Sequence, residues 1–235
     1  MQAFSEALKV NQTLTHLNFS ENQNGKEGIK SLCEVLKVNR TLTNWVFQNE
    51  IEAEAMKVLG EALKVNQTLT QLNLSLNQIG DQGMQTLSEG LKVNQTLTKF
   101  GLAWNQIGTE GVKYLSRALK LNRTLTNLNL SENHIGAKGV LYLSQALKIN
   151  RTLTVLDLSW NQIGFRENKD KEENIQEFIR SLKINKSIIK LNIDGNEINR
   201  KDLNKIDNLI KRNSQFSKKV NQISPKKEIC NFSKN

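Results

Sequence analysis

Residues 68–95 read TLTQLNLSLNQIGDQGMQTLSEGLKVNQ, and this stretch decides the fold of the chain. The same pattern recurs at spacings of 27 or 28 residues, with Thr-Leu pairs that begin at Thr13, Thr41, Thr68, Thr96, Thr124 and Thr152. A degenerate seventh copy begins at Ser187. Self-similarity at such a period is typical of repeat proteins, so the repeat is the structural unit that needs explaining.

Each repeat has two halves with different hydrophobic periods. In the quoted stretch, Leu72 and Leu74 alternate as the inward residues of a short strand do. Farther on, Met84, Leu87 and Leu91 recur at the 3- and 4-residue intervals of an amphipathic helix. Strands joined by helical crossovers run parallel. The predicted fold class is α/β: a curved solenoid, or horseshoe, with parallel strands on its concave face and helices on its convex face.

One column of asparagines follows the second inward strand residue at a constant offset of three. Its members are Asn22, Asn77, Asn105, Asn133, Asn161 and Asn196, and Asn49 joins them if the second repeat has lost one residue. A buried amide can donate to and accept from the backbone groups that a turning chain leaves unpaired, each of which would otherwise cost ~1–3 kcal/mol. We therefore expect this column to hold the turn between strand and helix.

A second column of asparagines follows the end of each predicted helix, at Asn11, Asn39, Asn66, Asn94, Asn122, Asn150 and Asn185. Asparagine tolerates the left-handed conformation that closes a helix, which predicts a C-terminal cap. The same residues form Asn-x-Thr or Asn-x-Ser sequons, so glycosylation is the alternative. The first nine residues show no basic or apolar signal segment, and this favours the cap.

The L-x-x-L-x-L-x-x-N core and its I-G-x-x-G-x-x-x-L-x-x-A-L continuation resemble the ribonuclease-inhibitor-like class of leucine-rich repeats. That class includes ribonuclease inhibitor, the Ran GTPase-activating protein and the repeat domains of NOD-like receptors. The resemblance covers residues 1–213 and implies a horseshoe that binds proteins. It leaves the function open, because function depends on sites placed on a fold.

The chain divides into a repeat array at 1–213, with a truncated first repeat, and a basic tail at 214–235. Residues 1–164 carry a net charge of only +3, whereas 211–235 carry seven basic and one acidic side chain. We expect the tail to be disordered. It could contact nucleic acid or an anionic membrane, or simply aid solubility. The incomplete first repeat indicates either a fragment of a longer protein or an exposed end.

Two further segments depart from the pattern. The second repeat has Glu52 and Ala55 where others have glycine, and Trp45 where others have leucine, which predicts a local distortion. Seven extra residues, 165–171, fall between a strand turn and a helix and should bulge from the rim. This charged insertion either touches a partner or is merely solvated.

The candidate partner-binding site combines the strand face with the residue before each turn asparagine. Because strand residues alternate, the side chains between the inward leucines face the concave surface. Trp104 and Trp160 precede turn asparagines two repeats apart, roughly 10 Å along the array. Exposed tryptophans are frequent interface anchors, although the rings could instead pack on the rim. The predicted site residues are Leu76, Lys99, Trp104, Glu132, Asp157 and Trp160.

The sequence gives little support to catalysis, and we expect a non-enzymatic module with no cofactor, metal or small-molecule substrate. His16 and His134 lie more than four repeats apart, so they cannot share a metal or form a nucleophile–base pair. Cys33 and Cys230 fit no metal or redox spacing, and a cytoplasmic location is expected. No apolar run is long enough to span a membrane, and the near-neutral array is not expected to bind nucleic acid.

Two alternatives to a simple binding module stay open. The first is a GTPase-activating or regulatory role resembling that of the Ran GTPase activator, for which Arg40, Arg123 and Arg151 would be candidates. Because these arginines recur with the repeat, they are better explained by a structural role than by a catalytic one. The second is that the chain is the sensor or repeat fragment of a larger receptor or effector.

Overall fold

A computed structural model of the chain describes residues 1–20, 22, 25–47, 53–164 and 170–223. Helices and strands alternate throughout these residues. The helices are α1 (Gln2–Val10), α2 (Gly25–Val38), α3 (Ala53–Val65), α4 (Gly80–Val93), α5 (Thr109–Leu121), α6 (Gly136–Leu147), α7 (Lys171–Ile184) and α8 (Arg200–Ile223). The strands are β1 (His16–Asn18), β2 (Asn44–Val46), β3 (Gln71–Asn73), β4 (Lys99–Gly101), β5 (Asn127–Asn129), β6 (Val155–Asp157) and β7 (Lys190–Asn192).

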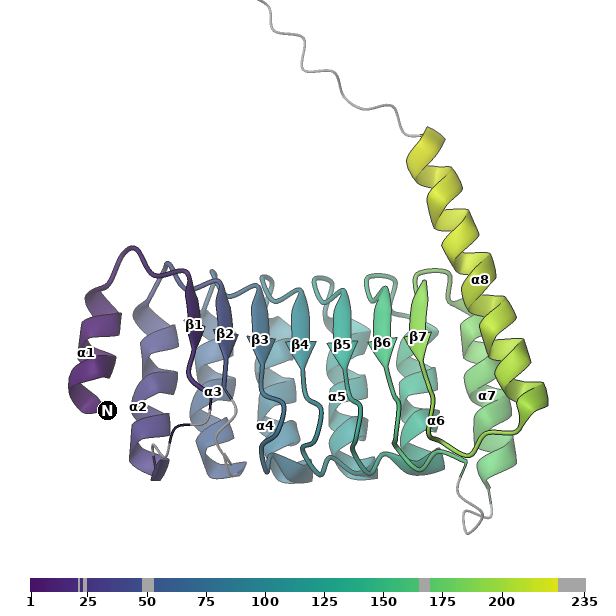
Figure 1. Cartoon of the computed structure of the whole chain (residues 1–235), viewed down its shortest axis with the longest axis horizontal. Helices are drawn as coiled ribbons and strands as arrows, with labels where there is room; N and C mark the ends of the chain where they lie inside the picture. The colour runs from purple at the N-terminus through teal and green to yellow at the C-terminus, as the bar shows by residue number, and fades with distance from the viewer. Residues whose placement is uncertain (21, 23–24, 48–52, 165–169, 224–235) are drawn as a thin grey trace, which may run out of the picture.

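The strands form one parallel sheet in chain order, β1 to β7, and the helices form a second layer behind it (Figure 1). The register follows the repeat, so that Gln71 pairs with Lys99 and Lys99 with Asn127. This confirms the predicted α/β solenoid. Its core lies between the two layers, where Leu72 and Leu87 are both almost fully buried.

From Asn77 onward the described turn asparagines form a buried ladder, as predicted. Asn22 departs from the prediction, because it is exposed and its Nδ2 donates to the carbonyl oxygen of Ser20. Asn133 shows the pattern: its Nδ2 donates to the carbonyl oxygens of Leu102 and Leu130 at 2.9 and 3.0 Å. Its Oδ1 accepts from the backbone N–H groups of Asn105 and Ile107 at 3.1 and 2.9 Å. Each amide therefore fastens its own turn to the preceding repeat. Asn49 lies outside the described residues.

The asparagines that follow the helices also bridge repeats, but not in the predicted conformation. Asn94 has φ −64° and ψ 134°, which is extended and not left-handed, so this part of the prediction was wrong. Its Oδ1 accepts from the N–H groups of Thr96 and Leu97, and its Nδ2 donates to the carbonyl oxygen of Leu63 in the preceding repeat. The side chain closes the turn, and the backbone has no need of the left-handed form.

The same bonds exclude glycosylation at the buried sequons of the described structure. Asn94, Asn122 and Asn150 are buried, and the Nδ2 that a glycan would occupy donates to a leucine carbonyl of the preceding repeat in each. A glycan on any of them is incompatible with the folded array.

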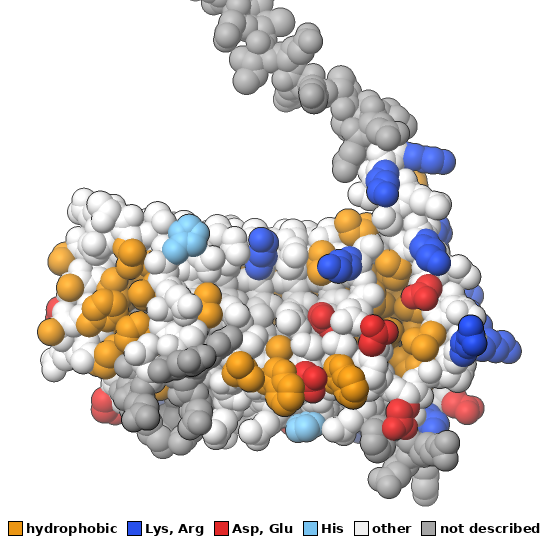
Figure 2. Space-filling view, in the orientation of Figure 1, with side chains coloured by type: hydrophobic (Ala, Val, Ile, Leu, Met, Phe, Trp, Pro, Cys, Tyr) orange, Lys and Arg blue, Asp and Glu red, His pale blue; other side chains and the backbone are white. Residues whose placement is uncertain are grey.

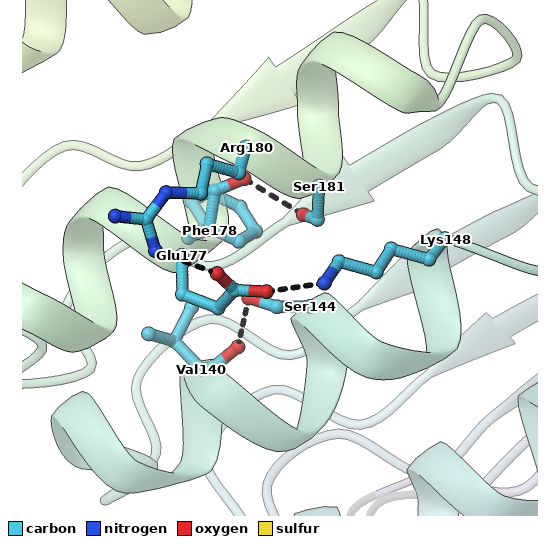
Figure 3. Close-up of polar contacts among 7 residues, drawn as sticks. All are labelled: Val140, Ser144, Lys148, Glu177, Phe178, Arg180 and Ser181. Atoms are coloured by element: carbon cyan, nitrogen blue, oxygen red, sulfur yellow. Dashed lines mark hydrogen bonds and ion pairs between the residues drawn. The ribbon is translucent and has the colours of Figure 1, made fainter.

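A network of charged groups links α6 to α7 on the helical layer (Figure 3). The Glu177 carboxylate accepts from Lys148, which follows α6, and from Arg180 Nη1 at 2.9 Å. Hydrogen bonds from Lys148 and Arg180 lower the pKa of Glu177. The link joins two consecutive repeats, and the insertion precedes α7 within the second of them. Of that insertion, 165–169 lie outside the described residues, and Lys171 opens α7.

The last helix closes the array and then extends beyond it. Ile206 is buried, and Arg212 Nη2 donates to the carbonyl oxygens of Leu182 and Asn185, which completes the end of α7. Residues 214–223 continue α8, so the predicted disorder of the tail is wrong for this part (Figure 1). Residues 224–235 lie outside the described structure, and the domain boundary at 213 stays a prediction.

Aromatic side chains fill the N-terminal end of the array. Phe4 stacks on Phe19 and Phe19 on Phe47, with centroids 5.5 and 6.1 Å apart, and Trp45 meets Phe47 edge-on. Trp45 is buried at the position that Leu72 and Phe100 occupy in the next two repeats. Of the other residues on which we predicted a local distortion, Glu52 lies outside the described residues and Ala55 lies in α3.

Candidate functional site

The six predicted site residues separate into two groups. Lys99 and Asp157 lie on the face of the sheet, in β4 and β6. The other four, Leu76, Trp104, Glu132 and Trp160, lie three residues past the ends of β3, β4, β5 and β6. They border the sheet at the carboxyl ends of its strands, which we call its edge. The structure therefore does not bring all six together.

The four edge residues form one file because the parallel hydrogen bonds continue past the strands. The backbone N–H groups of Leu76, Trp104 and Glu132 donate to the carbonyl oxygens of Ala103, Ser131 and Ser159 at 2.9–3.1 Å. Neighbouring members are thus one strand spacing apart, about 4.8 Å. Glu132 stands between the two tryptophans.

An unusual backbone conformation turns these side chains outward. Leu76, Trp104, Glu132 and Trp160 have φ between 55° and 60°, a left-handed region that residues other than glycine rarely adopt. Each of these residues directly precedes a turn asparagine, whose hydrogen bonds fix the chain at the turn and so impose this conformation. Consequently the tryptophans do not fold into the core: Trp104 is 55% exposed and Trp160 60%.

The two tryptophans border a hollow of about 580 Å³ at this edge. The described residues that line it are Trp104, Gln106, Glu132, Asn133, His134, Trp160, Gln162, Gly195 and Glu197. Figure 2 shows hydrophobic and acidic side chains gathered on this part of the surface. Among these described lining residues there are two carboxylates and neither lysine nor arginine.

Gly195 makes room for one wall of the hollow. A Cβ at this position would lie 2.5 Å from Cδ2 of Trp160, so the indole rests directly on the glycine backbone. The φ of Gly195 is 70°, which also disfavours any larger residue. The position of the Trp160 ring therefore depends on the absence of a side chain in the next repeat.

The sheet face carries a second hollow of about 430 Å³, bordered by Lys99, Asp157 and Lys190 together with amide and apolar side chains. Asp157 has a structural role here. Its Oδ1 accepts from the N–H and hydroxyl of Ser159, as Asn129 does from Ser131. Lys99 is exposed and available to a partner.

Sequence reasoning missed Gln106, His134, Gln162, Gly195 and Glu197, which complete the edge hollow. Apart from Gly195, these residues follow the turn asparagines by one position, a second file parallel to the first. Gln162 Nε2 lies 3.2 Å from His134 Nδ1, and this contact joins two repeats. A comparison of the residues that directly follow the turn asparagines would have found the four residues other than Gly195.

Catalytic features are sparse in the described part of the chain. Burial raises the pKa of the Cys33 thiol to about 12, so it stays protonated at neutral pH and is a poor nucleophile. No cluster of three or more potential metal ligands occurs among the described residues. Within the same residues, no helix is long and apolar enough to cross a bilayer.

The sequence matches the Leucine Rich repeat family model at residues 10–33, 65–88, 93–116, 121–144 and 150–164. With the single parallel sheet and its alternating helices, this establishes that the chain is a leucine-rich-repeat protein of the ribonuclease-inhibitor-like type. A search of curated protein sequences returned no match.

The chain is also similar to several solved structures. Leiomodin-1 actin-binding site 2 is 27% identical, with a TM-score of 0.60, over 69% of this chain and 92% of that chain. The tropomodulin C-terminal domain of Caenorhabditis elegans is 12% identical, with a TM-score of 0.50, over 94% and 97%. LegL7 from Legionella pneumophila is 19% identical, with a TM-score of 0.57, over 88% and 66%. The last two similarities concern the fold alone.

Proposed function

We propose that this protein is a non-catalytic module that holds a protein partner against the edge hollow and the adjoining sheet face. The observation that carries the proposal is the pair of tryptophans held outward by a strained backbone around a hollow. Exposed aromatic residues in a concavity are the usual anchors of protein interfaces. Strained backbone conformations persist at functional sites, where the surrounding structure imposes them.

The test is site-specific photo-crosslinking in a cell lysate from the source organism. A photoreactive phenylalanine replaces Gln162 in the hollow, Asn127 on the sheet face or Arg117 on the helical layer, one position at a time. We expect the same protein to crosslink from the first two positions and not from the third. The Trp104→Ala/Trp160→Ala variant, shown by circular dichroism to be folded, should lose this partner. Crosslinking from Arg117 alone, or an unchanged yield in the double variant, would contradict the proposal.

Actin is the first partner to test directly. The likeness to leiomodin-1 actin-binding site 2 covers 69% of this chain at 27% identity. Co-sedimentation with filamentous actin and native electrophoresis with monomeric actin together cover both forms. Binding that depends on Trp104 and Trp160 would make this chain an actin-binding protein. If neither form binds, actin is excluded and the partner is a different protein.

A further inference from the structure

The edge hollow is acidic in an array that is otherwise close to neutral, with a net charge of +3 over residues 1–164. The whole protein carries a net charge of +10. Glu132 and Glu197 nevertheless line the hollow, and no lysine or arginine is among its described lining residues. Since Glu132 lies between the two indoles, aromatic faces and negative charge occupy the same small space. We infer that the hollow receives an arginine side chain of the partner protein, an inference that rests on the function proposed above.

The lining selects a cation over an apolar side chain. An apolar group in the hollow would cover the two carboxylates without giving them a hydrogen-bond partner, and burial of an unpaired charge is costly. A cation removes this cost, because it donates charge-assisted hydrogen bonds to the carboxylates. It is also attracted to the face of an indole, by about 0.5–2 kcal/mol depending on its hydration.

Arginine fits the lining better than lysine. The guanidinium is flat, stacks on aromatic rings and presents five N–H donors in a fixed plane, whereas an ammonium is compact and strongly hydrated. The hollow offers several acceptors to such a group. These are the carboxylates of Glu132 and Glu197 and the side-chain carbonyls of Gln106 and Gln162.

The hollow is also preformed. Trp104, Gln106, Glu132, Trp160, Gln162 and Glu197 all have φ between 51° and 59°. The backbone N–H groups of Trp104, Glu132 and Trp160 donate to carbonyl oxygens of the next repeat, so little order is lost when a ligand enters. The ring of Trp160 is further placed by Gly195 beneath it. Preorganisation of this kind raises affinity by reducing the entropic cost of binding.

The experiment uses three short probes and the whole protein. The probes are acetyl-Gly-Arg-Gly-amide, its citrulline counterpart, which has nearly the same shape without the charge, and the lysine counterpart. Binding is followed by tryptophan fluorescence, because Trp104 and Trp160 are exposed while Trp45 is buried and gives a constant background. We expect saturable binding of the arginine probe in the millimolar range, about tenfold weaker binding of lysine and weaker still of citrulline.

Variants connect the binding to the hollow. Glu132→Gln/Glu197→Gln should weaken the arginine probe by about tenfold or more while the fold is kept. Glu61→Gln/Glu89→Gln, which removes the same two charges from the exposed faces of α3 and α4, should leave it unchanged. Equal binding of arginine and citrulline, or full binding by the double glutamine variant, would overturn the inference.

Partner binding by the two double variants distinguishes a failure of this inference from a failure of the proposed function. If the partner is lost from the tryptophan variant but retained in full by the double glutamine variant, the hollow binds a protein without an arginine in it. If the tryptophan variant itself keeps the partner, the proposed function fails with the inference.

Discussion

A single side chain, Asn133, satisfies backbone groups of two repeats at once. Its Nδ2 donates to three backbone carbonyl oxygens and its Oδ1 accepts from two backbone N–H groups. A buried water molecule makes only about 2–4 hydrogen bonds and cannot replace all of them. The sequence predicted this role because the asparagine recurs at a fixed offset from the strand. The chemistry of the amide, which both donates and accepts, made that prediction specific.

We expect Asn133→Ala to lower the free energy of unfolding by about 3–5 kcal/mol, since several buried backbone groups lose their partners. Urea denaturation measures the change. Asn44→Ala, on the half-buried sheet face, is the matched control and should alter stability by less than about 0.5 kcal/mol. Equal losses in the two variants would show that the ladder contributes nothing particular.

The left-handed residues were hidden from sequence reasoning. Leucine and tryptophan rarely adopt positive φ, so the sequence does not predict the conformation of Leu76, Trp104 and Trp160. Similarly, the asparagines after the helices were expected to be left-handed and are extended, because their side chains satisfy the turn instead. In both cases hydrogen bonds between repeats override the preference of the single residue.

Leu76 allows the strain to be measured outside the hollow. Leu76→Val should lower the free energy of unfolding by about 1–2 kcal/mol, because a β-branched side chain fits poorly at a φ of 60°. Leu76→Gly should be neutral or slightly stabilising, since glycine adopts this conformation freely and the leucine is half exposed. Thermal or urea denaturation distinguishes them, and a valine variant as stable as the glycine variant would contradict the assignment of strain.

At the scale of elements, the two hydrophobic periods predicted the strands and helices because each repeat buries the same faces. They did not predict the length of α8. Phe216 and Val220 continue its apolar spacing past residue 213 but remain largely exposed, and the neighbouring lysines made the segment resemble a disordered tail. A helix that leaves the body of the protein has no core to mark it in the sequence.

The ion pair between α6 and α7 makes this helix contact sensitive to pH. Because the pKa of Glu177 is lowered in the folded state, its contribution is complete above the pKa of an ordinary glutamate and is lost as the pH falls through the folded value. We expect Glu177→Gln to lower stability by about 0.5–1 kcal/mol at pH 7. The difference from the unmodified protein should shrink as the pH falls below about 4.

Urea denaturation at several pH values measures this difference. Glu110→Gln, whose carboxylate is paired with Lys113 within α5 alone, is the control for a charge pair that joins no repeats. A difference for Glu177→Gln that is constant from pH 7 to pH 3 would contradict the assigned role.

The whole molecule is a one-dimensional stack. Within the described structure, helices contact consecutive helices and strands contact consecutive strands, and α8 also contacts β7. Stability in such an array depends on nearest neighbours, so the ends should be weaker than the middle. The cores agree with this: Leu125 and Leu130 in the fifth repeat are fully buried, whereas Leu17 near one end and Ile198 near the other retain some exposure.

Hydrogen exchange should reveal this gradient. We expect the amides of β4 to β6 to exchange at least about tenfold more slowly than those of β1, with β7 in between because α8 covers it. Mass spectrometry of peptic fragments measures the rates. A single common rate for all protected amides would mean that the array opens only as one unit.

The succession of neighbour-to-neighbour contacts also has a mechanical consequence. When the two ends of the chain are pulled apart, the terminal repeat carries the whole load while having only one neighbour, so it yields before the interior does. Each asparagine ladder step that gives way releases one repeat, or about 100 Å of chain at ~3.5 Å per residue. The molecule should therefore lengthen in regular increments under tension, and slackening should let repeats rejoin the remaining stack one by one.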